Sequence, residues 1–232
     1  WAPLRFRAES ACALLAYLAR HPNAPCRHET IAGLLWPEVP DPRAFHNLRL
    51  ALHLLRRALA GPDGTADMLH ATRRTVMLAL GEDCWVDVAA FEASLDRGLA
   101  EEDGGPGASP RLQYLREAAG LYGGDLAEGF SFPSAPYEAW LVDERERLRL
   151  RALEALGGLA ACHERRDEWD EAAACARRQI ALEPCDEGAH RTLLRSLALA
   201  GHRGAALAHF AACRRTLAED LGVEPEPATL AL

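Results

Sequence analysis

The stretch from Asp41 to Gly61, DPRAFHNLRLALHLLRRALAG, decides the fold of the first part of the chain. Asp41 at the N-cap followed by Pro42 is typical of the start of a helix, and Gly61 followed by Pro62 is typical of its end. Between them, apolar residues recur at steps of three and four and so share one helix face. These residues are Ala44, Leu48, Ala51, Leu52, Leu55 and Leu59. The stretch therefore predicts a long helix with one buried face.

The opposite face of this predicted helix combines basic, hydrogen-bonding and leucine side chains. At about 100° per residue, that face carries Arg43, His46, Asn47, Leu50, His53, Leu54 and Arg57, and one flank carries Arg49 and Arg56. Arg and Asn can read base edges in a DNA major groove, and His can donate to phosphate. This pattern favours a DNA-reading helix, and the alternative is an ordinary surface helix with a solvated face.

The flanking segments predict two helices before this stretch and a β-hairpin after it. The expected elements are the end of a strand at 1–8, helices at 9–20 and 27–36, and strands at 69–72 and 75–80. Three helices followed by a hairpin is the order of a winged helix-turn-helix, in which the third helix enters the groove and the hairpin, or wing, reaches the flanking backbone. Arg73 and Arg74 fall in the predicted turn, where they either contact phosphate or are merely solvated.

The second part of the chain is predicted to be helical. Helices are expected at 89–100, 110–122 and 137–165, with a linker at 101–109 and an irregular segment at 125–136. Phe130 and Phe132 are expected to pack inward from that segment. Charges alternate in sign over 143–149, which is typical of a solvated, salt-bridged helix face.

The last third of the chain contains an internal repeat. Residues 167–173, DEWDEAA, match residues 201–207, GHRGAAL, at an offset of about 34, the period of tetratricopeptide helix pairs. Each unit supplies a turn and a helix of small residues, and Pro184 ends one repeat. Such units bury their faces only by stacking, and the stack leaves a groove for partners.

Charge and composition restrict the function further. Residues 1–88 hold ten Arg and nine acidic residues, a net charge of +1, and because the whole chain carries −8, the remainder carries −9. Only the first part is therefore expected to approach phosphate. The seven cysteines are dispersed and form no CxxC, so free thiols in a reducing cytoplasm are expected. No apolar run of about 18 residues and no leader is visible, so neither membrane association nor secretion is expected.

The sequence offers no catalytic or metal site. It contains no glycine-rich phosphate loop, nucleophile elbow or HExxH motif. His163 and His190 are interpreted as core-edge or solvated residues rather than metal ligands, and the acids of 143–149 are interpreted as ion-pair partners. We therefore assign no catalytic residue, no metal and no cofactor, and we expect a protein that is not an enzyme.

Several segments in order resemble the actinobacterial antibiotic regulatory protein family, which pairs a winged helix with a bacterial transcriptional activator domain. The segments are ALLAYLARHP (13–22), RHETIAGLLWPE (27–38), NLRLALHLLRRAL (47–59), CWVDVAAFEASL (84–95), LYGGDLAEGF (121–130), EAWLVDERERLR (138–149), DEGAHRTLLRSLALAG (186–201) and CRRTLAEDLGVEPEPAT (213–229). The resemblance implies a mainly α fold, with a winged-helix DNA-binding domain at 1–86 and a tetratricopeptide-like activator domain at 87–232. It also implies binding to direct repeats of double-stranded promoter DNA, a homodimer on that DNA, and contacts with RNA polymerase.

The chain departs from the family pattern in two places. Leu54 stands where a basic residue is common, and His53 replaces a small polar residue. The strands that begin the family's domain largely precede residue 1.

Two function hypotheses follow. In the first, the protein is a transcriptional activator that contacts DNA through Arg43, His46, Asn47, Arg49, His53, Arg57, Arg73 and Arg74, with Arg43 and Asn47 as the candidate base readers. In the second, the winged helix no longer binds DNA and instead docks a protein partner, possibly another part of a longer polypeptide, through Leu50 and Leu54.

Overall fold

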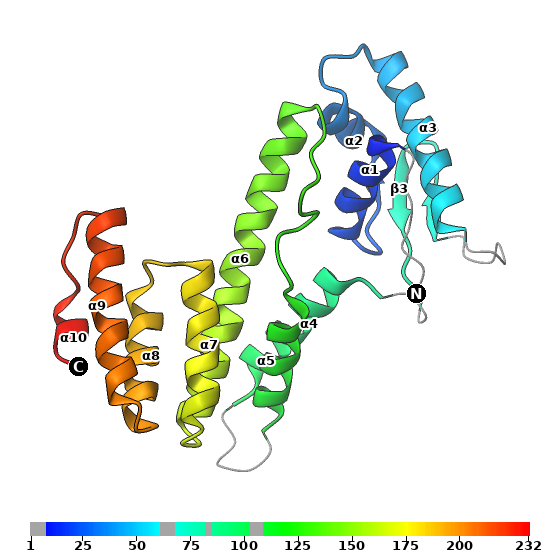
Figure 1. Ribbon diagram of the computed structural model, residues 1–232. Helices are drawn as coiled ribbons and strands as arrows, with labels where there is room; N and C mark the ends of the chain where they lie inside the picture. The colour runs from blue at the N-terminus through cyan, green and yellow to red at the C-terminus, as the bar shows by residue number, and fades with distance from the viewer. Residues whose placement is uncertain (1–7, 61–67, 82–84, 103–108) are drawn as a thin grey trace. The chain divides into compact units, whose positions relative to one another are not determined.

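The chain is mainly α-helical with one small antiparallel sheet, as the computed structural model in Figure 1 shows. The structure describes residues 8–60, 68–81, 85–102 and 109–232. Its contacts divide these residues into two compact units. The first unit contains the residues up to Ala90 together with Gly124–Leu148, and the second contains Phe91–Gly123 and Arg149–Leu232. In the described part of the chain, no helix is long and apolar enough to cross a membrane.

Three helices build the first unit, in the order that the sequence predicts. They are α1 (Glu9–Ala19), α2 (His28–Leu35) and α3 (Asp41–Leu59). The α3 residues expected to be buried are indeed inside, and Leu59 packs half-buried against the same core. Asp41 is the first helical residue rather than the N-cap, a position that Pro40 takes, and its carboxylate lies in the first turn, where the helix dipole favours negative charge. Residues 1–7 of the strand end expected at 1–8, and the stop signal Gly61-Pro62, lie outside the described residues.

A three-stranded antiparallel sheet completes the framework of the first unit. Its strands are β1 (Cys26–Arg27), β2 (Leu69–Ala71) and β3 (Thr75–Leu78), with β3 in the centre. The predicted hairpin is thus present, with Leu69 opposite Leu78 and Ala71 opposite Val76. Strand β1 is not among the predicted elements, and the predicted helix at 27–36 includes its residue Arg27. A strand of two residues is too short to show an alternating pattern in the sequence.

The segment 124–148 completes the core of the first unit, although it follows the helices α4 (Asp87–Ala100) and α5 (Pro110–Leu121) in the chain. Phe132, Tyr137 and Leu141 are buried in the same core as the leucines of α1 to α3. Phe132 thus packs inward as expected, and Phe130 is half-buried against this core. The predicted domain boundary after residue 86 remains a prediction.

Polar contacts also hold this segment within the first unit. The Ser134 hydroxyl donates a 2.5 Å hydrogen bond to the main-chain carbonyl of Leu34. On α6 (Ala135–Glu164), Glu144 pairs at 2.6 Å with Arg20, the residue that directly follows α1. Arg145 is half-buried and donates to the carbonyls of 126, 127 and 130. The predicted ion pairing over 143–149 is confirmed at Glu144, but Glu144 and Arg145 are half-buried rather than solvated, because they tie other segments of the unit to α6.

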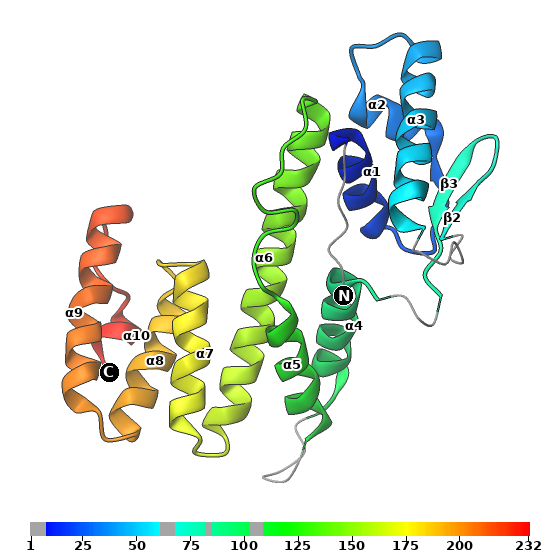
Figure 2. The same ribbon diagram turned by 45° about the vertical axis from the view of Figure 1, so that its right-hand side comes forward.

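The second unit is helical throughout its described residues. After α6 it contains α7 (Trp169–Leu182), α8 (Glu187–Leu199), α9 (Arg203–Asp220) and the short α10 (Pro227–Leu230). In Figures 1 and 2, α7, α8 and α9 stand side by side in a row. Small and branched side chains join them: Ala173 and Ala176 of α7 pack with Leu193 and Leu197 of α8.

Two histidines of the second unit, His163 and His190, are buried and hydrogen-bonded. His163 and His190 are each 3% exposed, so they lie deeper than a core edge. The His163 ring lies 2.5 Å from a Glu168 carboxylate oxygen, which joins the end of α6 to the turn before α7. The His190 ring contacts the Pro184 carbonyl at 2.8 Å and the His209 ring at 2.9 Å. These contacts give both histidines a structural role.

The described cysteines are free thiols, as expected. Cys26, Cys162, Cys175 and Cys213 are buried, Cys12 and Cys185 are partly exposed, and Cys84 lies outside the described residues. Burial raises the pKa of the Cys175 thiol to about 11, an effect that Arg178 and Arg116 partly offset. A buried thiol with so high a pKa is almost wholly protonated at neutral pH and is a poor nucleophile.

Candidate nucleic-acid interface

The outer face of α3 presents most of the predicted contact residues to solvent. Arg43, His46, Arg49, His53 and Arg57 are exposed, and Asn47 is half-buried. They face outward because Ala44, Leu48, Ala51, Leu52 and Leu55 take the opposite side of the helix into the core. None of the six polar side chains makes a hydrogen bond or ion pair with another described residue. Within the part of the chain that the structure describes, these six side chains therefore have no polar partner.

The two leucines assigned to this outer face lie in different environments. Leu50 is 52% exposed, as expected. Leu54 is half-buried and packs against the core of the first unit, so the prediction that it faces outward is wrong. Leu54 lies at the border between the two faces, where a long apolar side chain can bend toward the core. Only Leu50 adds an apolar group to the exposed surface of the helix centre.

Arg73 and Arg74 are both exposed in the turn between β2 and β3, as predicted. The Thr72 side chain fixes this turn: its hydroxyl oxygen accepts hydrogen bonds from the main-chain N–H of Arg74 at 3.2 Å and of Thr75 at 3.0 Å. The Thr72 N–H in turn donates to the Thr75 carbonyl at 2.8 Å. A hydroxyl that closes a turn onto its own backbone holds the loop in one conformation. The two guanidinium groups thus project from an ordered base.

Arg56 also belongs to this surface. The sequence predicts its position on the flank of the helix but no role for it. Its guanidinium donates a 3.2 Å hydrogen bond to the main-chain carbonyl of Leu69, at the start of β2. The contact ties the last turns of α3 to the hairpin. Sequence periodicity gives the angle of Arg56 on its helix but not the strand that lies beside it, so no signal in the sequence could have identified this contact.

A groove of about 690 Å³ lies between α2, α3 and the hairpin. Its cationic lining consists of Arg49 and Arg56 from α3 and Arg73 and Arg74 from the turn. The α2 residues His28 and Glu29 also line it. The main-chain N–H of His28 donates to the Arg74 carbonyl at 2.8 Å, which anchors the turn from the other side. The groove therefore brings four arginines together around one hollow.

The predicted contact residues thus fall into two sets. Arg49, Arg73 and Arg74 line the groove, together with the unpredicted Arg56. The remaining predicted contacts, at 43, 46, 47, 53 and 57, lie elsewhere on α3 and do not line it. The arrangement offers a ridge of side chains on the helix and a cationic hollow beside it. Both are suited to an extended polyanion, because phosphate binds to clustered guanidinium groups.

Two comparisons with known proteins give a match, one to the greater part of the sequence and one to the whole fold. The family described as "Bacterial transcriptional activator domain" matches residues 86–232, well over half of the chain. Among solved structures, the chain is similar to "Mycobacterium tuberculosis EmbR in complex with low affinity phosphopeptide", with a TM-score of 0.70 and 21% identity. The match covers 99% of this chain and 59% of that chain, so the present chain spans little more than half of its relative's length. At this identity the likeness shows a shared fold alone.

A comparison with curated proteins finds no significant match. The family match covers the greater part of the chain, including all the helices from α4 to α10. The chain therefore belongs to the bacterial transcriptional activator domain family.

Proposed function

We propose that the protein is a DNA-binding transcriptional activator. In this proposal the first unit is a winged helix, α3 lies in the major groove and the β2–β3 hairpin is the wing. The observation that supports it is the arrangement of α3 and the turn: exposed polar side chains without partners among the described residues lie beside a groove with four arginines. Membership of an activator family supports the same assignment.

The arginines divide between two kinds of DNA contact. Arg43 and Asn47, on the first half of α3, are the proposed base readers, because a recognition helix contacts bases through its N-terminal residues. Arg49, Arg73 and Arg74 surround the groove, where a phosphate fits between helix and wing. The other contacts proposed are His46, His53 and Arg57 on the exposed side of α3. The second unit, with its tetratricopeptide-like helix row, is proposed to contact RNA polymerase.

Selection of bound duplexes from a random pool, at a stated salt concentration, tests the proposal and identifies the operator. We expect enrichment of direct repeats, since head-to-tail binding of two copies produces that symmetry. Arg57→Ala is expected to weaken binding to all duplexes alike and to lower the slope of log K against log salt by about 1. Arg43→Ala is expected to relax the sequence preference instead. Absence of binding at low salt would overturn the proposal.

The second candidate function is a protein-docking winged helix, and the exposed side chain of Leu50 is the observation that favours it. Leu50→Arg separates the two functions: it adds a positive charge to a DNA-facing helix, and so raises DNA affinity, but it removes the apolar contact that a protein partner needs. Leu54→Arg is unsuitable for this test, because Leu54 packs against the core.

A further inference from the structure

A second groove, of about 620 Å³, lies at the C-terminal end of the helix row in the second unit. Its apolar lining comes from α8, α9 and the last residues of the chain: Leu194, Leu199, Leu207, Phe210, Leu230 and Leu232. Several of these side chains are far from buried, since Leu207 is 63% exposed and Leu199 is 54% exposed. The volume lies in the range of pockets that bind ligands. Among the described residues, this end of the row therefore presents a concave apolar surface that no other helix covers.

The repeat explains why an apolar surface lies here. At the offset of 34, Ala173 and Ala176 of α7 correspond to Leu207 and Phe210 of α9. The two α7 residues receive Leu193 and Leu197 of the next helix, α8. Their counterparts on α9 line the groove instead. The open surface is thus a continuation of the α7–α8 interface by one period, and a helix is the shape that this interface accepts.

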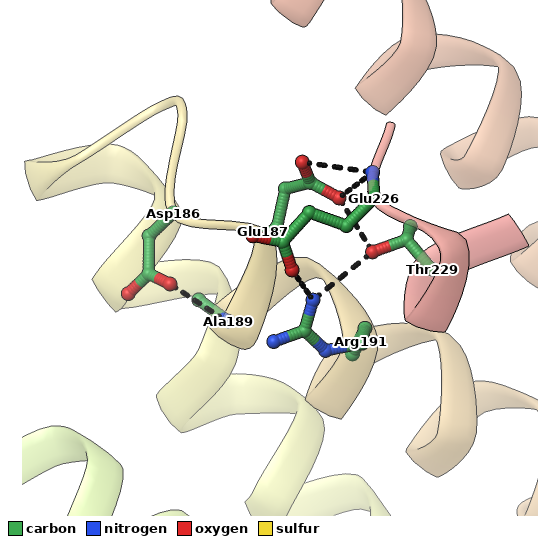
Figure 3. A network of polar contacts seen from close by, with 6 residues as sticks. All are labelled: Asp186, Glu187, Ala189, Arg191, Glu226 and Thr229. Carbon is green, nitrogen blue, oxygen red and sulfur yellow. Dashed lines mark hydrogen bonds and ion pairs between the residues drawn. The ribbon is translucent and has the colours of Figure 1, made fainter. Parts of the chain in front are cut away.

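The short helix α10 forms one wall of the groove and is held firmly against α8, as Figure 3 shows. The Glu187 carboxylate accepts hydrogen bonds from the Glu226 N–H at 2.9 Å and from the Thr229 hydroxyl at 2.6 Å. Arg191 pairs with Glu226 at 2.8 Å and donates to the Thr229 hydroxyl at 3.1 Å. Thr229 is 1% exposed, so the hydroxyl at the centre of the network is buried, whereas the Glu226 side chain is 61% exposed. The wall of the groove is thus built in advance of any ligand.

The charged residues that line the groove are Arg195 and Arg203. Arg195 already pairs with Glu164 at 2.9 Å. Arg203 is exposed, and among the described residues its side chain has no hydrogen-bond or ion-pair partner. An apolar floor with a cation at its edge is complementary to an apolar helix face bordered by carboxylates.

We propose that this groove docks an acidic amphipathic helix of a partner protein, in the position that the next repeat helix would take. Leu207 and Phe210 receive the apolar side chains of that helix, and Arg203 pairs with a carboxylate beside them. A second copy of this chain fits less well, because in a two-fold contact the groove meets its own lining, which holds two arginines and no acidic side chain. The proposal does not depend on DNA binding by the first unit.

Fluorescence anisotropy with three synthetic helical peptides and the whole chain tests the proposal. Each peptide has roughly 18 residues, about five helical turns. The first carries Leu along one face and Glu beside it, the second replaces each Glu by Lys, and the third replaces each Leu by Gln. The protein variants are Leu207→Gln, Arg203→Glu and, as a matched control on α6, Leu150→Gln, which is 52% exposed and outside the groove.

We expect only the acidic peptide to bind the unmodified chain appreciably. Leu207→Gln should weaken that binding by about tenfold or more, and Leu150→Gln should leave it unchanged. Arg203→Glu should reverse the preference between the acidic and the Lys peptides. The proposal is overturned if no peptide binds, if the acidic and Lys peptides bind equally well, or if Leu150→Gln has the effect of Leu207→Gln. It is also overturned if sedimentation finds a dimer that Leu207→Gln dissociates, because the occupant is then a second copy.

Discussion

Arg56 Nη2 lies 3.2 Å from the carbonyl oxygen of Leu69 and so links helix α3 to the first strand of the hairpin. The neighbouring Arg57 is also exposed, but its side chain contacts no described residue through a hydrogen bond or ion pair. Two adjacent arginines thus differ in role: the first positions the hairpin, and the second is available to a ligand.

Arg56→Ala is therefore expected to lower both stability and DNA affinity. The loss of one hydrogen bond to a main-chain carbonyl costs about 1 kcal/mol of unfolding free energy. The hairpin keeps its contacts with β1 and His28 but loses its tie to α3, so Arg73 and Arg74 are held less firmly beside the groove. Urea unfolding and anisotropy with the selected duplex measure the two effects. Arg57→Ala is the matched control, which should weaken DNA binding and leave the urea midpoint unchanged. Equal stability losses in the two variants would contradict the positioning role.

Leu141→Ala is expected to destabilise the first unit, although Leu141 lies well beyond the predicted boundary at 86. The side chain is fully buried among the leucines of that unit, so its truncation leaves a cavity and costs about 2–5 kcal/mol. The adjacent Val142 is 59% exposed, and Val142→Ala should change the unfolding free energy by less than about 0.5 kcal/mol. Chemical denaturation of the two variants, followed by Trp fluorescence, measures the difference. A fragment of residues 1–86 that is as stable as residues 1–148 would refute this account of the core.

The sequence predicts the helices and the hairpin of the first unit well, because their signals are local. The three- and four-residue spacing from Ala44 to Leu55 and the basic turn at Arg73 each lie within a single element. The sequence does not predict contacts between segments that are far apart in the chain. Nothing in the periodicity of α6 indicates that Glu144 pairs with Arg20, or that Ser134 reaches Leu34.

For the candidate site too, the sequence predicts the direction of side chains on a helix but not their contacts with other elements. The outward direction of Arg43, Arg49 and Arg57 follows from helix geometry. The half-buried position of Leu54 and the contact of Arg56 with Leu69 depend on what packs beside the helix. A helical wheel gives the angle of a side chain but not its neighbours. The groove itself, which joins residues from α2, α3 and the hairpin, could not be found from any one of these segments.

The His190–His209 pair predicts a pH dependence of stability. Burial, the neighbouring His190 and Arg177 all lower the pKa of His209 from its ordinary value of 6.5. The folded state thus favours neutral His209, and the unfolded state takes up a proton more readily. The stabilisation is complete above pH 6.5 or so and is lost as the pH falls through the lower, folded-state pKa. Urea unfolding between pH 7.5 and roughly 5 should show this loss, and His209→Gln should reduce its slope. An unchanged slope in that variant would refute the assignment.

The network around Thr229 predicts a local rather than a global effect at the C-terminus. Thr229→Val keeps the size of the side chain but removes the hydroxyl that donates to Glu187 and accepts from Arg191. The loss of these two hydrogen bonds costs about 1–3 kcal/mol, and α10 has only four residues through which other contacts could hold it. We expect α10 to detach while α7, α8 and α9 stay folded, so amide exchange should accelerate at 226–231 alone.

Thr229→Ser, which retains the hydroxyl, should exchange nearly as slowly as the unmodified chain. Detachment of α10 also removes Leu230 from the groove wall, so Thr229→Val should weaken binding of the acidic helical peptide where Thr229→Ser does not. Fast exchange in both variants would mean that packing of the methyl group, rather than the hydrogen bonds, holds α10 in place.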